Sequence, residues 1–449
     1  MDNNYKYTTI HVLDSAPGTG KTTSVIKMMN NNPNKKFIYI SPNLTEAERI
    51  VNSCPKLNFK EPSDKNKTIS KSENLLSLIG KYENISSTHS LFEKLTDETL
   101  DALSKRNYTF IMDETFSVLE KFKMFPSINA ESGQYLTQLI KSNMDSLLEY
   151  SIVKVDKTFK VIWTTDKAFD GYRNVKDYCD RGLLYYMGRG ALMWSYPARF
   201  FNKDIFEEIF ILTYQFDMLV MKSYFSYHAI DYNKYFTRLQ SSSSILKTGN
   251  DCFGVSSIYK TQDASHDLPF VSKLKKNIKI VEYPAMNAIG NEYYALSHSW
   301  YKYANQQQSR DISSKMTNFF TNYSDALKHE RMWTVFKQFS YKIQGKYLRK
   351  NKDTLIELNV RATNNFRHKR ALVYPVNRFY HPSTKTFFSA RKVGLKDDDL
   401  ALSEMLQWLM RSRLREGKSI DLFIPSRRQR NILKAYLNNE EYDKDKSYD

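Results

Sequence analysis

The residues with the clearest potential for chemistry occupy positions 15–23 and read S-A-P-G-T-G-K-T-T. A run typical of a β-strand, residues 8–13, precedes them, and a segment typical of a helix, residues 22–30, follows. A glycine-containing loop between a strand and a helix can surround phosphate oxygens with backbone N–H groups, and the positive end of the helix dipole favours the same anion. The pattern therefore predicts a P-loop that binds a nucleoside triphosphate, taken to be ATP.

Within this loop the residue types have separate tasks. Lys21 would reach the β- and γ-phosphates, and the Thr22 hydroxyl would bind Mg²⁺. Gly18 and Gly20 would let the backbone approach the ligand closely. The loop departs from the usual pattern at its first position, where Ser15 stands in place of glycine. The predicted nucleotide-binding residues of the loop are Ser15, Ala16, Pro17, Gly18, Thr19, Gly20, Lys21, Thr22 and Thr23.

An acidic pair supplies the second half of such a site. The apolar run 108–112 is typical of a buried strand, and it ends in Asp113 and Glu114. At that position Asp113 would help to hold Mg²⁺ through its water shell, and Glu114 would polarise the attacking water. An acidic dipeptide alone means little, so its weight comes from its place after the strand. We expect Lys21, Asp113 and Glu114 to be catalytic.

Strand-like and helix-like segments alternate in the first part of the chain, which predicts an α/β domain with a parallel sheet. Ligands bind such sheets at the carboxyl ends of the strands. Polar residues at or next to these ends are candidates for nucleic-acid contacts or for coupling, namely Ser41, Thr88, His89 and Thr213. Thr88 and His89 would either contact a nucleic-acid backbone or cap a helix. Thr213 would either sense the γ-phosphate or simply end its strand.

Composition divides the chain into three parts. Residues 1–240 form the first predicted domain, with an insertion at about 120–200 that contains a hairpin near 152–163. Residues 241–272 are rich in serine and turn formers, which predicts a linker. Residues 273–449 show new strand and helix patterns, which predict a second α/β domain. Further candidates for nucleic-acid contacts or coupling follow its strand-like runs, namely Arg361, Asn377 and Arg378.

Composition also limits the class of protein. The formal net charge of +18 either attracts nucleic acid or merely reflects a lysine-coated surface. The cysteines Cys54, Cys179 and Cys252 have no paired spacing, which argues against a disulfide framework and a zinc site. The polar start and the lack of a long apolar run predict a cytoplasmic protein that does not contact membranes.

Together these segments resemble helicase superfamilies 1 and 2, whose members carry two RecA-like domains on one chain. The likeness is closest to DEAD/DEAH-like helicases of bacteriophages and mobile elements of Gram-positive bacteria. It rests on the P-loop, the pair Asp113-Glu114, and residues 212–214, 359–364, 377–379, 407–415 and 424–427. The resemblance implies an α/β fold of two tandem RecA-like domains with parallel sheets and an insertion in the first domain.

The resemblance also implies a role for residues 407–415. Gln407 would help to bind the nucleotide, and an arginine would reach across the domain cleft to the γ-phosphate. A guanidinium there can neutralise the charge that spreads over the phosphoryl oxygens. Met410 stands where glycine is usual, and the last arginine lies one residue late. The catalytic arginine is therefore either Arg411 or Arg415, unless the helix only presents a basic face.

The function implied is that of an ATP-dependent DNA helicase or translocase in phage or mobile-element DNA replication. Its partners would be single-stranded or forked DNA and other replication proteins, although RNA fits equally well. An ATP-driven packaging motor is an alternative, but it would add a nuclease with clustered carboxylates. After residue 280 the sequence offers the cluster Asp397, Asp398 and Asp399. A nucleotide-gated clamp that binds nucleic acid without moving along it is the second alternative.

Overall fold

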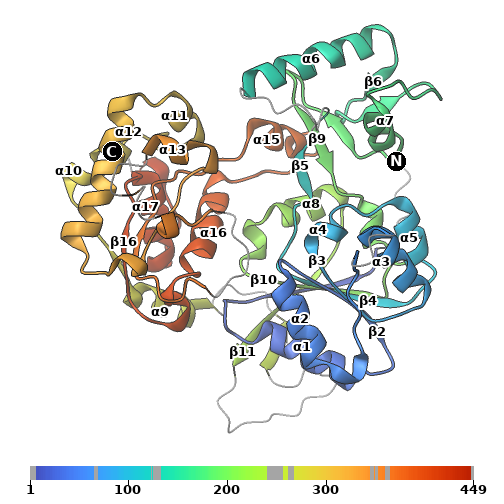
Figure 1. The fold of residues 1–449 in the computed structure, drawn as a ribbon, viewed down its shortest axis with the longest axis horizontal. Coiled ribbons are helices and arrows are strands. Elements are labelled where there is room, and N and C mark those ends of the chain that lie inside the picture. Colours follow the sequence, from blue (N-terminus) through green and yellow to red (C-terminus); the bar gives the residue numbers. More distant parts are fainter. Residues whose placement is uncertain are drawn as a thin grey trace.

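The structure is a computed structural model that describes residues 7–64, 69–122, 124, 133–239, 256–260, 267–343, 348, 352–358 and 365–445. Figure 1 shows two α/β bodies beside one another, with a smaller unit above the first. The expected fold class, two tandem α/β domains with parallel sheets and an insertion in the first, is confirmed. No described helix is long and apolar enough to cross a membrane.

The first domain is built on a seven-stranded sheet with the order β12-β11-β1-β10-β4-β2-β3. All neighbouring strands are parallel except β11 and β12. The strands are β1 (Thr9–Asp14), β2 (Lys36–Ser41), β3 (Ile85–Thr88), β4 (Tyr108–Asp113), β10 (Glu208–Thr213), β11 (Asn233–Leu239) and β12 (Ser256–Lys260). Strand β10 lies between β1 and β4, so the ends of these three strands meet at one edge.

Helices cover both faces of this sheet. Leu13 and Tyr39 belong to a buried cluster with residues of α1 and α2, whereas Val12 and Ile40 belong to a second cluster with residues of α5 and α8. Because both faces are buried, the strands read as nearly continuous apolar runs. The helices of this domain are α1 (Lys21–Asn31), α2 (Leu44–Ser53), α3 (Lys71–Gly80), α4 (His89–Phe92), α5 (Asp97–Leu103) and α8 (Val220–His228).

The insertion has a buried core of its own, which includes Met144, Val161 and Leu184. The predicted hairpin is confirmed, because β6 and β7 pair antiparallel. Asp156 forms its turn by accepting hydrogen bonds from two backbone N–H groups, of Thr158 at 2.7 Å and of Lys160 at 3.0 Å. The elements are β5 (Leu119–Lys121), α6 (Gly133–Glu149), β6 (Val153–Val155), β7 (Val161–Trp163), α7 (Arg173–Asp180), β8 (Leu184–Tyr186) and β9 (Leu192–Ser195).

The second domain has a four-stranded parallel sheet with the order β13-β16-β15-β14. Its strands are β13 (Ile278–Ile280), β14 (Arg331–Trp333), β15 (Ala371–Val373) and β16 (Ile420–Phe423). Its helices are α9 (Leu268–Asn277), α10 (Pro284–Asn287), α11 (His298–Tyr303), α12 (Gln306–Asn318), α13 (Ser340–Ile343), α15 (Pro382–Ser389), α16 (Asp397–Leu409) and α17 (Arg427–Asn438). The predicted linker 241–272 lies mostly outside the described residues, and its described part contains β12 and the start of α9.

The segment that begins at Leu355 has a strand-like sequence up to residue 360, but its described part, up to residue 358, contains no strand. The run that begins at Leu355 follows a short 3-10 turn, Lys352–Thr354, and makes a single bridge to Trp333. The turn places the Thr354 hydroxyl 3.0 Å from the indole Nε1 of Trp333, which donates a hydrogen bond to it. This bond anchors the segment at the edge of β14 and replaces the extended pairing that a strand would need.

Helix α15 of the second domain packs into the first. Phe387 and Phe388 belong to the main buried cluster of the first domain. The Phe387 ring stacks on Tyr227 of α8 and meets Tyr185 of β8 edge-on, each with ring centroids 4.8 Å apart. Figure 1 shows α15 lying beside β9, apart from the rest of the second domain. The helix therefore ties the second domain to both α8 and the insertion.

Phe387→Ala should destabilise the protein by about 3–5 kcal/mol, because it removes a buried ring and leaves a cavity. Urea denaturation of the full chain measures the change. Ser389→Ala, on the exposed side of the same helix, is the matched control and should unfold like the parent protein. Equal stability of Phe387→Ala and the parent would show that α15 does not fasten the two domains.

Candidate nucleotide site between the domains

The loop between β1 and α1 has a conformation that requires two glycines. Gly18 and Gly20 have φ of +83° and +89°, in the left-handed region that other residues rarely adopt. Gly20 immediately precedes α1 and provides no side-chain cap. The N–H groups of the first helical turn have no partners within the helix, so they are available to an anion in the loop.

Lys21 begins α1 and turns its ammonium into the loop. Its Nζ donates to the carbonyl oxygens of Ser15 and Ala16, the latter at 3.1 Å. Burial lowers the pKa of Lys21 to about 8, although nearby carboxylates, Asp113 foremost, oppose this effect. A phosphate would give the ammonium a charged acceptor in place of these neutral carbonyls.

The lowered pKa of Lys21 predicts a pH dependence of stability. Between about pH 8 and pH 10.5, the folded chain has released a proton that the unfolded chain still holds. Stability rises with pH wherever the unfolded state binds more protons, so this lysine should make the protein more stable as pH rises through that window.

Denaturation midpoints of the parent protein and of Lys21→Met across this pH window measure the contribution. As the pH rises, the denaturation midpoint of the parent protein should increase relative to that of Lys21→Met, because methionine does not titrate. A difference between the two midpoints that is independent of pH would contradict the lowered pKa.

Asp113 ends β4 beside the loop. Its Oδ2 accepts hydrogen bonds from the Tyr39 hydroxyl at 2.6 Å and from the Thr22 hydroxyl at 3.3 Å. Burial raises the pKa of Asp113, while the Tyr39 bond and the charge of Lys21 oppose the rise. The structure thus brings together the hydroxyl and the carboxylate that the sequence assigned to magnesium. Both are oxygen donors of the kind that Mg²⁺ prefers, so the pair is chemically suited to hold this ion.

Glu114 follows Asp113 in a left-handed conformation, with φ of +61°. Its backbone N–H donates to the Leu212 carbonyl at 2.8 Å, which fixes the turn, and its side chain is exposed. Non-glycine residues with positive φ are uncommon, and they are found preferentially at functional sites. The exposed carboxylate can reach water, as its predicted role requires.

His89 holds the main chain of the acidic pair in place. It is 1% exposed, and its Nε2 donates to the carbonyl oxygen of Asp113 at 2.9 Å. The predicted contact with nucleic acid is therefore wrong for His89, and so is helix capping. Thr88 precedes α4 without a side-chain cap, because its hydroxyl pairs with that of Ser90 at 3.0 Å.

The serine at the first position of the loop has a structural explanation. Ser15 is buried, and its Oγ accepts a hydrogen bond from the backbone N–H of Thr237 on β11 at 2.6 Å. The Thr237 hydroxyl is in turn 3.0 Å from that of Thr19, further along the same loop. Glycine at position 15 would lose the first of these contacts. The side chain of Ser15 therefore fastens the loop to the neighbouring strand.

Ser15→Ala should destabilise the protein by about 1–3 kcal/mol, because it leaves the buried N–H of Thr237 without its acceptor. Chemical denaturation checks the value. Ser117→Ala is the control, since that hydroxyl is only partly buried and makes a longer bond to the Leu119 carbonyl. A Ser15→Ala variant no less stable than Ser117→Ala would refute the fastening role.

The other strand-end candidates of the first domain are both buried. The Ser41 hydroxyl donates to the Asn43 carbonyl at 2.8 Å and so shapes the start of α2. Its full burial contradicts the predicted contact with nucleic acid. Thr213 accepts a hydrogen bond from the backbone N–H of Ser15 at 3.1 Å through its carbonyl oxygen. Thr213 therefore touches the P-loop, and its coupling role stays a prediction.

The arginine predicted to complete the site comes from the second domain. Arg411 follows α16, and its Nη1 donates long hydrogen bonds to the carbonyls of Glu357 and Leu358, at 3.5 and 3.4 Å. Burial lowers the pKa of Arg411 to about 10, and the negative charge of Glu114 opposes this shift. The guanidinium thus lies within electrostatic reach of the acidic pair.

Two other residues of the predicted arginine segment are exposed. Gln407 lies on α16, and Arg415 lies in the 3-10 turn Arg413–Glu416 that follows it. The charge of Arg411, one of the two arginines that the sequence left open, interacts with that of Glu114. This observation favours Arg411 as the catalytic arginine.

Sequence reasoning assigned no role at this interface to Tyr214 of the first domain, or to Tyr436 and Asp267 on the other side. The hydroxyls of Tyr214, after β10, and Tyr436, on α17, form a hydrogen bond between the domains. The carboxylate of Asp267, just before α9, acts electrostatically on Lys21. Tyr214 lies in the run 212–214 that carried the resemblance, but no local pattern marks Tyr436 or Asp267 for this interface.

A comparison with known proteins identifies the family to which the chain belongs. It is 31% identical over 444 residues to the "SPbeta prophage-derived uncharacterized protein YonV" of Bacillus subtilis (strain 168), a match that covers 96% of this chain and 99% of the relative. The chain belongs to the YonV family. A family model described as the YonV C-terminal Rossmann-like domain matches residues 272–437, the part that holds the sheet β13-β16-β15-β14.

Two solved structures are distantly similar to this YonV-family chain. The structure of S. tokodaii Xpd4 matches with a TM-score of 0.39 and 10% identity, over 97% of this chain and 94% of that one. The DUF1998 helicase MrfA, bound to DNA, matches with a TM-score of 0.29 and 10% identity, over 97% of this chain and 46% of that one.

In the Rossmann-like domain, two of the predicted strand-end residues, Asn377 and Arg378, have partners within the fold. Asn377 is fully buried, donates to the carbonyls of Tyr293 and Ala295, and accepts a hydrogen bond from Arg428. Arg378 forms a two-pronged ion pair with Glu404. These partners leave Asn377 no group for a nucleic-acid contact, so that prediction is wrong. Arg361 lies outside the described residues.

Proposed function

We propose that this YonV-family protein is an ATP-dependent helicase or translocase that moves along nucleic acid. The proposal rests on a site divided between the domains: Lys21 and the pair Asp113-Glu114 belong to the first domain, and Arg411, whose pKa the charge of Glu114 affects, belongs to the second. A site divided in this way is complete only when the cleft is closed, so hydrolysis and domain movement are coupled.

Each residue of the site has a separate role in phosphoryl transfer. Lys21 exchanges its loop carbonyls for the β- and γ-phosphates of ATP, and Arg411 neutralises charge on the γ-phosphoryl group. Glu114 orients the attacking water and accepts its proton. Thr22 and Asp113 would hold Mg²⁺, which when bound screens the charge of the phosphates. The hydrogen bond between the hydroxyls of Tyr214 and Tyr436 joins the two domains, so it would form when the domains close and break when they open.

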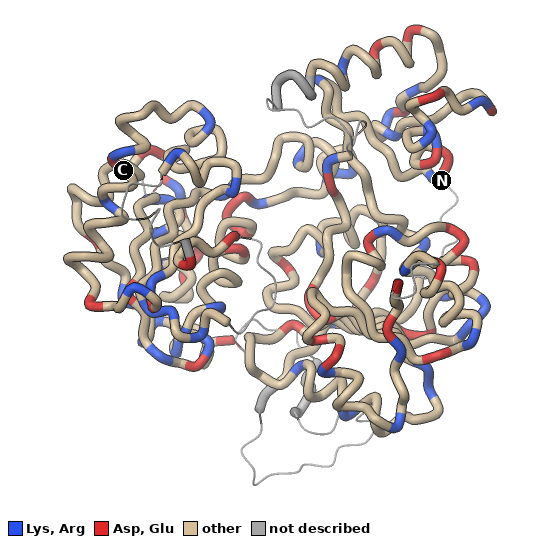
Figure 2. The backbone as a smooth tube through the Cα atoms, in the orientation of Figure 1, with Lys and Arg blue, Asp and Glu red and all other residues tan. Residues whose placement is uncertain are grey.

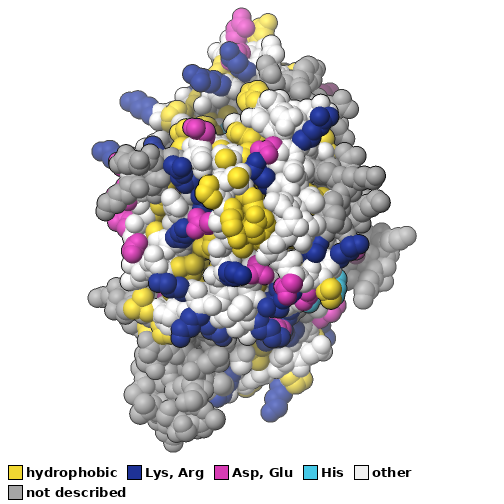
Figure 3. Space-filling model, turned by 90° about the vertical axis from the view of Figure 1, so that its left-hand side faces the viewer, with side chains coloured by type: hydrophobic (Ala, Val, Ile, Leu, Met, Phe, Trp, Pro, Cys, Tyr) yellow, Lys and Arg dark blue, Asp and Glu magenta, His cyan; other side chains and the backbone are white. Residues whose placement is uncertain are grey.

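The net charge of the chain suits a polyanion as its partner. Figure 2 shows Lys and Arg on both bodies, with Asp and Glu between them. On the face of the second domain in Figure 3, Lys and Arg side chains are interspersed with Asp and Glu around a small apolar patch. The net charge of +18 favours nucleic acid electrostatically. We take the partner to be single-stranded or forked DNA. The prophage origin of the relative suggests DNA replication in a phage or mobile element, together with other replication proteins.

Lys21→Ala should abolish ATP hydrolysis while leaving the fold intact, because it removes the ammonium that would contact the β- and γ-phosphates. Arg411→Ala should lower kcat by about 10³-fold or more, the usual effect of losing a transition-state arginine. Arg415→Ala is the matched control and should stay close to the parent protein. Steady-state ATPase assays with and without single-stranded DNA measure all three, and a fully active Lys21→Ala would refute the site.

A strand-displacement assay tests the movement. DNA and RNA duplexes with a 5′ or a 3′ overhang separate activity, polarity and substrate in one experiment. Displacement that requires ATP supports the proposal. ATPase activity without displacement or movement would favour the nucleotide-gated clamp, and absence of ATPase activity would overturn both.

The packaging motor is disfavoured by the acidic cluster itself. Asp397 accepts hydrogen bonds from the Tyr380 N–H and from Lys385, and Asp398 pairs with Arg428. Both carboxylates begin α16, where the helix dipole favours negative charge. Their cationic partners make a nuclease metal site a poor description of this cluster.

A further inference from the structure

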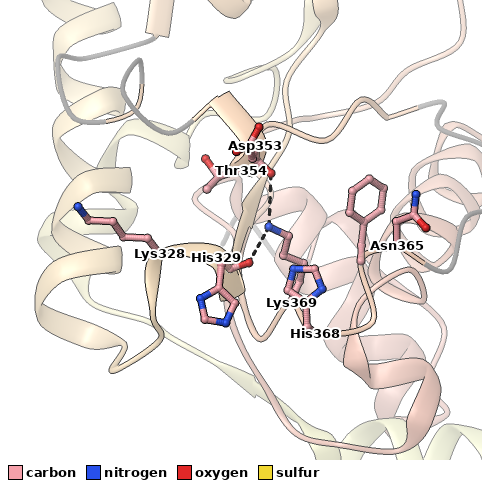
Figure 4. Close-up of a pocket in the computed structure, with 8 residues that line it drawn as sticks. Lys328, His329, Asp353, Thr354, Asn365, His368 and Lys369 are labelled. Carbon is pink, nitrogen blue, oxygen red and sulfur yellow. Dashed lines mark hydrogen bonds between the residues drawn. The ribbon is translucent and has the colours of Figure 1, made fainter.

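A pocket of about 370 Å³ lies in the second domain, at the edge where β14 and β15 begin. Figure 4 shows that its lining comes from three segments, the residues just before each of these strands and the turn at Lys352–Thr354. The lining includes Lys369, His329, His368, Asn365, Phe366 and Asp353. Its polar side chains are mainly hydrogen-bond donors, with a single carboxylate among them.

Lys369 is the central feature of this pocket. It is 3% exposed, and its Nζ donates to the carbonyl oxygens of His329 at 2.7 Å and Asp353 at 3.4 Å, as Figure 4 shows. These acceptors are neutral main-chain groups. Burial lowers the pKa of Lys369, and the carboxylate of Asp353 relieves only part of this effect. A buried cation with so little counter-charge is costly, and an anion in the pocket would offset that cost.

Groups around the ammonium suit an anion with several oxygens. The rings of His329 and His368 have centroids 5.9 Å apart. His368 hydrogen-bonds the main chain of His329, and burial together with the charge of Lys369 lowers the pKa of His368. A phosphate oxygen would replace that main-chain acceptor, and the His329 imidazole can donate an N–H as well. His368 and Asn365 are exposed, so they can be reached from solvent. Figure 4 shows Lys328 directed away from the other side chains, so we do not count it as a ligand.

The pocket is connected to the catalytic arginine. The segment 353–358 lines the pocket at Asp353 and supplies the carbonyls that hold Arg411, those of Glu357 and Leu358. On the other side, the Lys369 carbonyl accepts a hydrogen bond from the backbone N–H of Arg413 at 3.2 Å. A ligand that steadies Lys369 and Asp353 therefore acts on both chain segments next to Arg411.

We propose that this pocket binds a phosphate group, either one in a nucleic-acid backbone or free phosphate. The site is distinct from the P-loop, because it lies in the other domain and uses none of the same residues. Hydrogen bonds from a cation to phosphate oxygens are the strong, charge-assisted kind.

Calorimetric titration tests the proposal on the full chain carrying Lys21→Ala, which weakens phosphate binding at the P-loop. Inorganic phosphate and a single-stranded oligothymidylate are the two probes. Lys369→Gln and His368→Ala should each weaken phosphate binding at least tenfold. His368→Ala carries the test if Lys369→Gln fails to fold, since His368 is exposed. Lys279→Ala, an exposed lysine elsewhere in this domain, should bind like the parent.

The outcomes decide both the site and the source of its ligand. Phosphate binding that the oligonucleotide displaces, and that both pocket variants weaken, assigns the pocket to a nucleic-acid backbone. Binding that the oligonucleotide does not displace assigns it to free phosphate. Failure of phosphate to bind, or binding unchanged in His368→Ala, overturns the proposal. Because every variant carries Lys21→Ala and the readout is phosphate binding, none of these results depends on whether the protein hydrolyses ATP.

Discussion

Opposite charges buried at one edge of the first sheet constrain the rest of the structure. Burial disfavours the charged forms of both Lys21 and Asp113. At Lys21 the charge of Asp113 is the strongest influence that opposes burial, and at Asp113 the charge of Lys21 ranks second to the Tyr39 hydrogen bond. The pair stays compatible with folding because donors and acceptors surround it, from β2, α1, α4 and the loop itself. The order β1-β10-β4 is what brings these elements to one place. A different register would leave a buried charge without a partner.

The second domain adds to this edge without sharing its sheet. Asp267, Tyr436 and Arg411 approach from three separate elements, and each is tied electrostatically or by hydrogen bonding to a first-domain residue. Helix α15 makes a second attachment far along the interface, through aromatic packing rather than charge. The polar contacts near the nucleotide site can break and re-form. The apolar contact of α15 holds the domains together while the polar contacts are broken.

Local sequence predicted those parts of the site that lie on one continuous segment. The glycines of the P-loop and the strand ending in Asp113 follow from backbone geometry and from burial on both sheet faces, which leave patterns in the chain. Burial also misled the prediction, because His89 and Ser41 looked like exposed strand-end residues but hold the main chain in place. Three contacts of the structure join segments that are distant in the chain. They are the bond between Ser15 and Thr237, the bond between Tyr39 and Asp113, and the packing of Phe387 into the core of the first domain. No local pattern encodes such contacts.

The reach of α15 has a consequence for how the chain is made. Synthesis proceeds from the N-terminus, so the first domain leaves the ribosome long before residues 387 and 388 exist. Its core, which includes both phenylalanines, is then missing two rings beside Tyr227 and Tyr185. Exposed apolar surface of this kind makes a nascent domain prone to aggregation. The core of the N-terminal domain is therefore completed only after most of the second half has been translated.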